Sequence, residues 1–265
     1  MRIFSIILLG CFWELANIYA QTENITDNNG LKQGAWTKYH PNGNIWYQGI
    51  FKDDHPVGEF NRYYPDGNIK ALMEFDVTGI NARVKLFYKT GKLAASGNFH
   101  EQKNDSLWKY YTPEEKLLFE INYKSGIKHG LSKKYLPGRY LIEEADWKNG
   151  KIHGLWKQYH ENGAVKLVIN YKKDIRTGLV FVFHTSGARE ITGSYKNDLR
   201  DGIWNFYKET GELKYTINYI KGKASNQDEL DKINQEEFLM YEMNRYKLKD
   251  PELYINDPME YIRIR

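Results

Sequence analysis

The sequence lacks most of the features that would assign it to a functional class at once. It has a single cysteine, Cys11, and a net charge of only +4 from 38 basic and 34 acidic residues. A charge this small permits an acidic partner but does not require one. The chain has no phosphate-binding loop, no dinucleotide fingerprint and no nucleophile elbow. We therefore predict a protein that is not an enzyme and has no catalytic residues and no cofactor.

The first twenty residues predict export. Arg2 precedes an apolar stretch at residues 3–13, which is too short to span a bilayer, and Ala20 offers a small residue for cleavage. Cleavage after Ala20 would leave no cysteine, and therefore no disulfide or cysteine-bound metal. In the alternative interpretation, Leu8-Leu9-Gly10-Cys11 is a lipobox and Cys11 carries a lipid. Both interpretations place the protein in the periplasm, at the surface or outside the cell; a buried N-terminal element is the third alternative.

Aromatic residues, by contrast, are abundant, at 15% of the chain, and they recur with a fixed period. Units of 24 residues follow one another eight times from Gly34 without an insertion. The sixth place of each unit holds Tyr39, Tyr63, Phe87, Tyr111, Tyr135, Tyr159, Phe183 or Tyr207. The eighteenth place holds Phe51, Phe75, Phe99, Tyr123, Trp147, Tyr171, Tyr195 or Tyr219. Such a period indicates stacked supersecondary units, each too small to bury its own apolar face, and we predict that these rings form a structural ladder.

Each unit predicts a β-hairpin. Pro41-Asn42-Gly43 suits a type I turn closed by a left-handed glycine, and Pro137-Gly138 favours a type II turn. The second strand alternates apolar and polar residues, which is typical of a sheet with one wet face. Aromatics also occupy the third place, as in Trp36. On a regular strand the third and sixth places would face opposite sides of the sheet. Either a bulge redirects one of these two places, or both sheet faces carry aromatics.

We therefore predict an all-β fold, an elongated single-layer antiparallel meander of about eight hairpins. The predicted divisions are a signal peptide at 1–20, a polar linker at 21–33, the repeats at 34–222 and a helix with a tail at 223–265. The helix would begin near Ser225 and cap the last repeat. Tyr254 and Tyr261, in two similar phrases of the tail, would pack on the sheet. The alternative for both parts is docking to a partner.

The first unit resembles the MORN-like repeat of bacteria. Residues 34–45 fit its pattern, Gly-x-Trp-x-x-Tyr-x-Pro-Asn-Gly-x-Ile, at every fixed place, and the resemblance extends over about 34–222. Units three to five fit least well, as Ala82, Ser132 and Glu115 show. The resemblance implies the fold. Similar chains are often labelled as antitoxins of the YwqK family, and such repeats are linked to protein assembly and membrane attachment, which are associations rather than derivations.

Lysines form two further rows, which we take as a candidate binding surface. The fourth place holds Lys85, Lys109, Lys133 and Lys157, and the nineteenth holds Lys124, Lys148, Lys172 and Lys196. With tyrosines nearby, these rows would suit an anionic glycan or lipid head groups. The alternative is a solvated face that keeps the protein soluble and discourages edge pairing.

The remaining ionisable groups predict no metal site. His40, His160 and His184 share the seventh place, where neighbouring units lie about 9.6 Å apart, too far to chelate one ion. We expect these histidines to be exposed beside the turns. Asp53-Asp54 and Asp198 with Asp201 lie in loops and lack the spaced oxygen ligands of a calcium loop, so turn chemistry explains them better.

Together these observations predict an exported repeat protein that acts as a scaffold for protein–protein interaction. The alternatives are a module that binds envelope glycan or anionic membrane, and an antitoxin-like partner of a toxin. Nucleic acid is disfavoured as a partner because the protein is expected to be exported.

Overall fold

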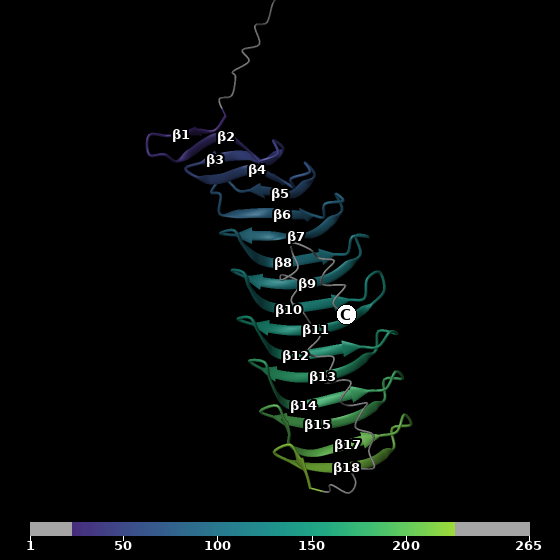
Figure 1. Ribbon diagram of the computed structural model, residues 1–265. Coiled ribbons are helices and arrows are strands. Elements are labelled where there is room, and N and C mark those ends of the chain that lie inside the picture. The colour runs from purple at the N-terminus through teal and green to yellow at the C-terminus, as the bar shows by residue number, and fades with distance from the viewer. Residues whose placement is uncertain (1–22, 226–265) are drawn as a thin grey trace, which may run out of the picture.

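The computed structural model describes residues 23–225, and every regular element in this range is a β-strand. Consecutive strands pair antiparallel in one sheet, except that two short segments of one strand, at residues 199–200 and 202–207, both pair with the strand at 189–196, and Figure 1 shows the sheet as a long twisted ribbon. The strands are β1 (Ile25–Thr26), β2 (Lys32–Tyr39), β3 (Ile45–Lys52), β4 (His55–Tyr63), β5 (Ile69–Phe75), β6 (Asn81–Phe87), β7 (Leu93–His100), β8 (Lys103–Tyr111), β9 (Leu117–Lys124), β10 (Ile127–Tyr135), β11 (Leu141–Lys148), β12 (Lys151–Tyr159), β13 (Val165–Lys172), β14 (Ile175–Phe183), β15 (Arg189–Lys196), β16 (Leu199–Arg200), β17 (Gly202–Tyr207), β18 (Leu213–Ile220) and β19 (Lys223–Ala224).

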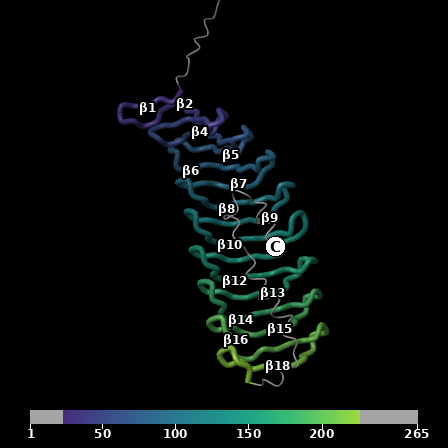
Figure 2. Tube along the Cα trace, in the orientation of Figure 1, coloured from purple at the N-terminus to yellow at the C-terminus, as the bar shows by residue number. Residues whose placement is uncertain are grey.

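The predicted single-layer meander is confirmed, and the trace in Figure 2 follows it from one hairpin to the next. The segment predicted to be a polar linker contains a strand instead. In it, β1 pairs with β2 to make a small hairpin ahead of the first repeat. Asp27 closes this hairpin by accepting hydrogen bonds from the backbone N–H groups of Asn29 and Leu31. The predicted signal peptide, Cys11 and all but the start of the predicted C-terminal helix and tail lie outside the described residues.

Two kinds of tight turn connect the strands. Within a unit, the glycine at the tenth place takes a positive φ, 89° at Gly43, as predicted for a type I turn followed by a left-handed residue. At Pro137 the left-handed residue is Gly138 instead, with a φ of 68°, which agrees with the predicted type II turn. Between units, two-residue loops such as Asp53-Asp54 have positive φ at both places, which is typical of a type I′ turn. Most connections between units are therefore only two residues long, and the exception is the loop between β5 and β6.

The glycine that opens most units marks a β-bulge. Gly58 has a φ of 65°, and the register between β3 and β4 shifts beside it. Ser106 takes the same conformation at a φ of 59°. Ala82, the other departure from glycine, lies where β5 and β6 pair without any register shift. This unit therefore does not need a left-handed residue there, since its strands are joined by the longer loop after Asp76.

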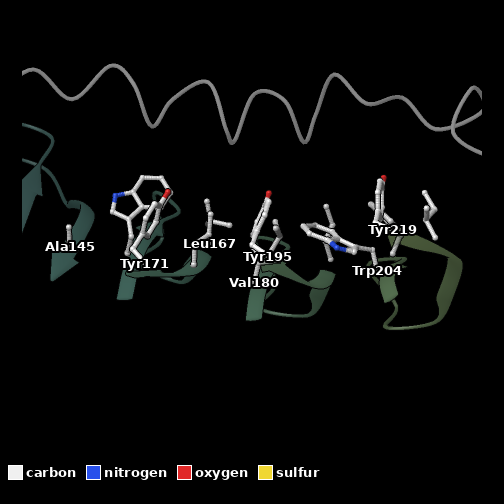
Figure 3. Close-up of a cluster of buried hydrophobic side chains, with 13 residues drawn as sticks. Ala145, Leu167, Tyr171, Val180, Tyr195, Trp204 and Tyr219 are labelled. Carbon is white, nitrogen blue, oxygen red and sulfur yellow. The ribbon is translucent and has the colours of Figure 1, made fainter. Parts of the chain in front are cut away.

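The sheet has two unlike faces. One, which we call the apolar face, carries the third, fifth, fourteenth, sixteenth and eighteenth places; Trp108 and Trp204 on it have 0% exposure and Trp156 has 1%. Ala145, Leu167, Tyr171, Val180, Tyr195, Trp204 and Tyr219 lie together on this face in Figure 3. The other, which we call the open face, carries the second, fourth, sixth, fifteenth and seventeenth places.

The sixth and eighteenth places therefore do not form one ladder of rings. In the first unit Lys38 pairs with Tyr47 and Tyr39 pairs with Ile45, so Trp46 is an extra residue on the second strand. The bulge is on the second strand, while the first strand runs unbroken from Trp36 to Tyr39, so ordinary alternation puts the sixth place on the face opposite to the third, and both faces carry aromatics. The eighteenth-place rings are mostly buried, whereas those of the sixth place are half-buried or exposed, with Tyr39 at 57%.

Packing on the apolar face matches large residues with small ones. A Cβ atom built on Gly193 would lie 2.2 Å from the ring of Trp204, and one built on Gly97 would lie 2.4 Å from Trp108. Each ring covers the glycine of the preceding strand, and its Nε1 donates to the next carbonyl, as Trp108 does to Asn98 at 2.9 Å. Where the third place is small, as at Val180, the sixteenth is large, as at Ile169. Volume is thus kept nearly constant along the face.

The fifth unit interrupts the apolar face. One buried cluster runs from Tyr47 to Tyr123 and the other from Ala145 to Tyr219. Between them the third place is Ser132, which accepts a hydrogen bond from Nε1 of Trp147 at 2.7 Å. The fourteenth place is Glu143, which is buried. Burial raises the pKa of Glu143 to about 7, although Lys134 and Lys128 act in the opposite direction.

Candidate interaction surface

Lysines at the fourth place lie on the open face, where glutamates of the fifteenth place meet them. Nζ of Lys109 is 3.2 Å from Glu120, and Nζ of Lys133 is 3.5 Å from Glu144. Lys157 pairs across the strands with Glu144, while Lys85 pairs with Ser96. This row of the candidate surface is therefore partly neutralised by carboxylates of the same face.

Sixth-place tyrosines join the same network. The hydroxyl of Tyr135 donates to Glu120 at 2.8 Å, and that of Tyr159 donates to Glu144 at 2.6 Å. Burial and the carboxylate raise the pKa of Tyr135 to about 12. Burial would raise the pKa of Glu120, but its hydrogen bonds from Tyr135 and Lys109 outweigh this and hold it below its ordinary value. The centre of the open face is thus a set of satisfied charges.

The nineteenth-place lysines, which we call the lysine row, are arranged differently. Lys124, Lys148, Lys172 and Lys196 are all exposed and end the strands β9, β11, β13 and β15. Over residues 23–225 none of them has a carboxylate partner within ion-pair distance. Their charges therefore remain available along one edge of the open face.

A third row on this face was not noticed in the sequence. The second place of the last five units holds exposed aliphatic side chains, which we call the leucine row. Its members are Leu107 at 39% exposure, Leu131 at 38%, Leu155 at 42%, Leu179 at 62% and Ile203 at 63%. The first three units have Ala35, Glu59 and Arg83 at this place. The shared period of 24 residues is the signal that marks this row in the sequence.

The leucine row and the lysine row run side by side. Leu131 pairs across the strands with Asp146, and Leu155 pairs with Asn170. Lys148 and Lys172 follow these partners by two residues and so project on the same face. The result is a row of exposed aliphatic side chains, separated by the polar seventeenth place, with a basic border on one side, extending over the second half of the ribbon.

The seventh-place histidines are half-buried rather than exposed. Nε2 of His160 lies 2.8 Å from the carbonyl oxygen of Phe183, and Nε2 of His40 lies 3.1 Å from that of Tyr63. Tyr64 fills the same role with its hydroxyl, which donates to Phe87 at 2.7 Å. Each partner is 23 residues away, in the next unit. These side chains therefore connect neighbouring turns, and in the part of the chain described no His, Cys, Asp or Glu cluster could hold a metal ion.

The loop aspartates make the corresponding connections at the other edge. Oδ1 of Asp54 accepts from the backbone N–H of Lys32 at 2.8 Å, and Oδ1 of Asp198 accepts from Arg176 at 3.0 Å. In each case the donor is 22 residues earlier, in the preceding unit. These aspartates therefore bond to the preceding unit, which the prediction of local turn chemistry did not include. Of the residues described, none lies in a helix long and apolar enough to cross a membrane.

A single-layer sheet of equal hairpin units is the architecture of a repeat protein. Five segments match the family model of the MORN repeat variant, at residues 32–53, 56–76, 105–125, 152–173 and 200–221. The chain is a MORN-like repeat protein. Repeats of this kind are often involved in binding proteins or membrane lipids.

Other comparisons add little. Curated protein sequences gave no match. The crystal structure of TarM aligns with 13% identity and a TM-score of 0.26, over 35% of this chain and 20% of that chain. The TCP10 domain of Danio rerio CPAP, solved with a peptide of Danio rerio STIL, aligns with 11% identity and a TM-score of 0.19, over 70% of this chain and all of that domain. Neither likeness bears on the function of this chain.

Proposed function

We propose that the protein is a non-enzymatic scaffold that binds another protein through the leucine row. The observation that carries this proposal is the repetition of an exposed aliphatic side chain at one place of five consecutive units. Single exposed apolar residues are ordinary, whereas here an aliphatic side chain recurs at the same place of consecutive units and alternates with polar residues of the seventeenth place, such as Asp146 and Asn170. Equivalent places lie about 9.6 Å apart, two strand spacings, so the row spans roughly 40 Å. That length suits an extended partner surface rather than a small molecule.

Charge then defines the partner further. The lysine row borders the leucine row on one side, and its exposed ammonium groups favour a partner with acidic residues beside an apolar strip. The fourth-place lysines contribute less, because Lys109 and Lys133 are already paired with glutamates. Export of the protein remains a prediction from residues 1–20, so the expected partner is a component of the cell envelope or of its surroundings.

Site-specific photo-crosslinking tests this proposal. A photoreactive residue replaces Leu155 in the full-length chain, expressed in its own cells, and adducts are identified by mass spectrometry. The matched control places the same residue at Arg83, the second place of the third unit, which lies on the same face outside the leucine row. We expect one adduct from position 155 that is absent from position 83 and is lost when Leu131 and Leu179 are changed to Asp. Equal adducts at both positions would rule out the leucine row as the binding surface.

An anionic membrane or glycan is the second candidate, favoured by the unpaired charges of the lysine row. The test is sedimentation with vesicles containing phosphatidylglycerol, at low and at high salt. Changing Lys148 and Lys172 to Glu should abolish binding, whereas the same change at the paired Lys109 and Lys133 should weaken it less. Absence of sedimentation at low salt would remove the anionic membrane as a ligand and leave the first candidate untouched.

A further inference from the structure

One row of the open face alternates basic and acidic side chains from strand to strand. Glu120 on β9 pairs with Lys109 on β8 and with Lys133 on β10. Glu144 on β11 pairs in the same way with Lys133 and with Lys157 on β12. Ion pairs of 3.2 Å at Glu120 and 3.5 Å at Glu144 result. Each of these carboxylates therefore lies between two lysines of the adjacent strands.

The third unit has the lysine of this row but not the carboxylate. Ser96 on β7 takes the place of the glutamate, between Lys85 on β6 and Lys109 on β8. Lys85 is exposed, and among residues 23–225 no carboxylate lies within ion-pair distance of it. A single negative charge placed above Ser96 would therefore continue the alternation found in the next two units.

Lys85 and Ser96 line a shallow hollow of about 650 Å³ on the open face, over β4 to β7. This volume is in the range of small-molecule sites, about 300–1,000 Å³. The lining also includes Asn61, Leu72 and Asn98. The two amides offer hydrogen-bond donors and acceptors, and Leu72, 38% exposed, offers an apolar surface. The hollow therefore has the mixed lining that a small polar ligand needs.

The other end of the hollow is acidic. Glu59 and Glu74 pair directly across β4 and β5, and Arg83 lies 3.6 Å from Glu74. Both carboxylates are at least two strands, about 9.6 Å, away from Ser96. They accept hydrogen bonds but repel a second negative charge. A matching ligand therefore carries one carboxylate at one end and hydroxyl donors at the other.

We propose that this hollow binds an acidic sugar, the uronic acid of a glycan, with its carboxylate above Ser96 and beside Lys85. Ring hydroxyls of the sugar donate to Glu59 and Glu74, and its C–H groups contact Leu72. An acidic peptide fits less well, because further carboxylates along its chain would be repelled by Glu59 and Glu74. The hollow belongs to the second and third units, outside the leucine row, so this proposal does not rest on the proposed function.

Titration of the full-length chain with galacturonate, followed through the NMR signals of the sugar, tests the proposal. The neutral methyl ester of galacturonic acid is the matched ligand control, and a blocked Ala-Glu-Ala peptide stands for the acidic side chain of a protein. We expect galacturonate to bind about tenfold more tightly than the ester, which has no charge to pair with Lys85. Equal affinity of acid and ester, binding of the peptide but not of galacturonate, or no binding at all would overturn the proposal.

Two variants change the position above Ser96 itself. Lys85→Gln removes the positive charge, and Ser96→Glu supplies the carboxylate from the chain, so each should weaken the binding of galacturonate about tenfold. Lys133→Gln, at a lysine that is already paired, and Thr192→Glu, at the same place of the seventh unit, are the matched controls and should leave the affinity unchanged.

Ser96→Glu should fold normally, because Glu120 and Glu144 occupy the same place in the next two units, and thermal denaturation checks this. Affinity that stays unchanged in both Lys85→Gln and Ser96→Glu would show that the sugar binds elsewhere and would overturn the proposal. None of these variants alters the leucine row, so photo-crosslinking at Leu155 fails or succeeds independently.

Discussion

The two faces of this sheet are built from the same strands but obey different rules. On the apolar face neighbouring places compensate one another in volume, so that Gly193 stands beneath Trp204 and Ile169 stands beside Val180. On the open face they compensate in charge, as Glu144 does with Lys133 and Tyr159. Because alternate residues of each strand face opposite sides of the sheet, one set of side chains stabilises the fold and the other set is available for binding. A residue and its neighbour in the chain therefore contribute to different properties.

The strongest test of this separation is to add volume beneath a ring. We expect Gly193→Val to lower the free energy of unfolding by about 3 kcal/mol, because its Cβ would lie 2.2 Å from Trp204. Thr192→Val, one residue away on the open face, should change it by less than about 1 kcal/mol. Urea denaturation of both variants provides the measurement.

A double-mutant cycle sharpens the same comparison. Gly193→Ile with Trp204→Val recreates the pair found at Ile169 and Val180. The combination should recover at least half of the loss caused by Gly193→Ile alone. Strict additivity of the two changes would show that volume is not shared between these places.

Next in size is the effect of pH on the two faces. On the apolar face, the pKa of Glu143 rises from an ordinary 4.5 to about 7, so the folded state holds this proton more tightly than the unfolded chain. Its contribution to stability is therefore complete below pH 4.5 and declines as the pH rises to 7, by about 2–3 kcal/mol. Glu143→Gln should remove this decline in denaturation curves measured between pH 4.5 and 8.

Glu120 on the open face should behave in the opposite way. Its pKa is lowered, so its contribution is present above its ordinary pKa and is lost as the pH falls through the lowered value. Glu120→Gln should therefore lower the free energy of unfolding at neutral pH and change it little in acid. A parallel pH dependence for the two glutamine variants would contradict the assignment of these residues to unlike faces.

A smaller effect is expected from the tyrosines of the open face. Tyr159→Phe removes one hydrogen bond to a carboxylate and should cost about 1 kcal/mol in the free energy of unfolding. Tyr39→Phe is the matched control. Because the ring of Tyr39 is exposed, removing its hydroxyl should not measurably change the free energy of unfolding. Equal losses in thermal denaturation would show that the network has no role of its own.

The smallest effect concerns the lysine row. Lys148→Glu should change the free energy of unfolding by less than about 0.5 kcal/mol, since the side chain is exposed and pairs with no carboxylate among residues 23–225. A stability loss comparable to that of Tyr159→Phe would mean that this row supports the fold rather than binds a partner.

The sequence predicted what repeats locally. The period, the hairpins and both turn types follow from proline, glycine and ring placement, because these residues act within a few positions of themselves. The face occupied by the sixth place stayed open, since the sequence does not show on which strand of the hairpin the extra residue lies; the bulge at Trp46 is on the second strand and leaves the first strand regular. The role of His160 also escaped prediction, because its partner is one full unit away. The leucine row was visible but has no chemical signature until exposure is known.

The hydrogen bonds that join neighbouring units at both edges of the sheet limit how the length of such a chain can change. His40 and Asp54 each bind the backbone one unit away, so adding or removing a few residues would misalign every bond of this kind. A whole unit can be gained or lost while all neighbours keep their partners. Evolution can therefore lengthen this molecule only in steps of one repeat, and each step extends its reach by about 9.6 Å. The hydrogen bonds between the turns therefore fix the length of the unit, and with it the increment by which the protein can grow.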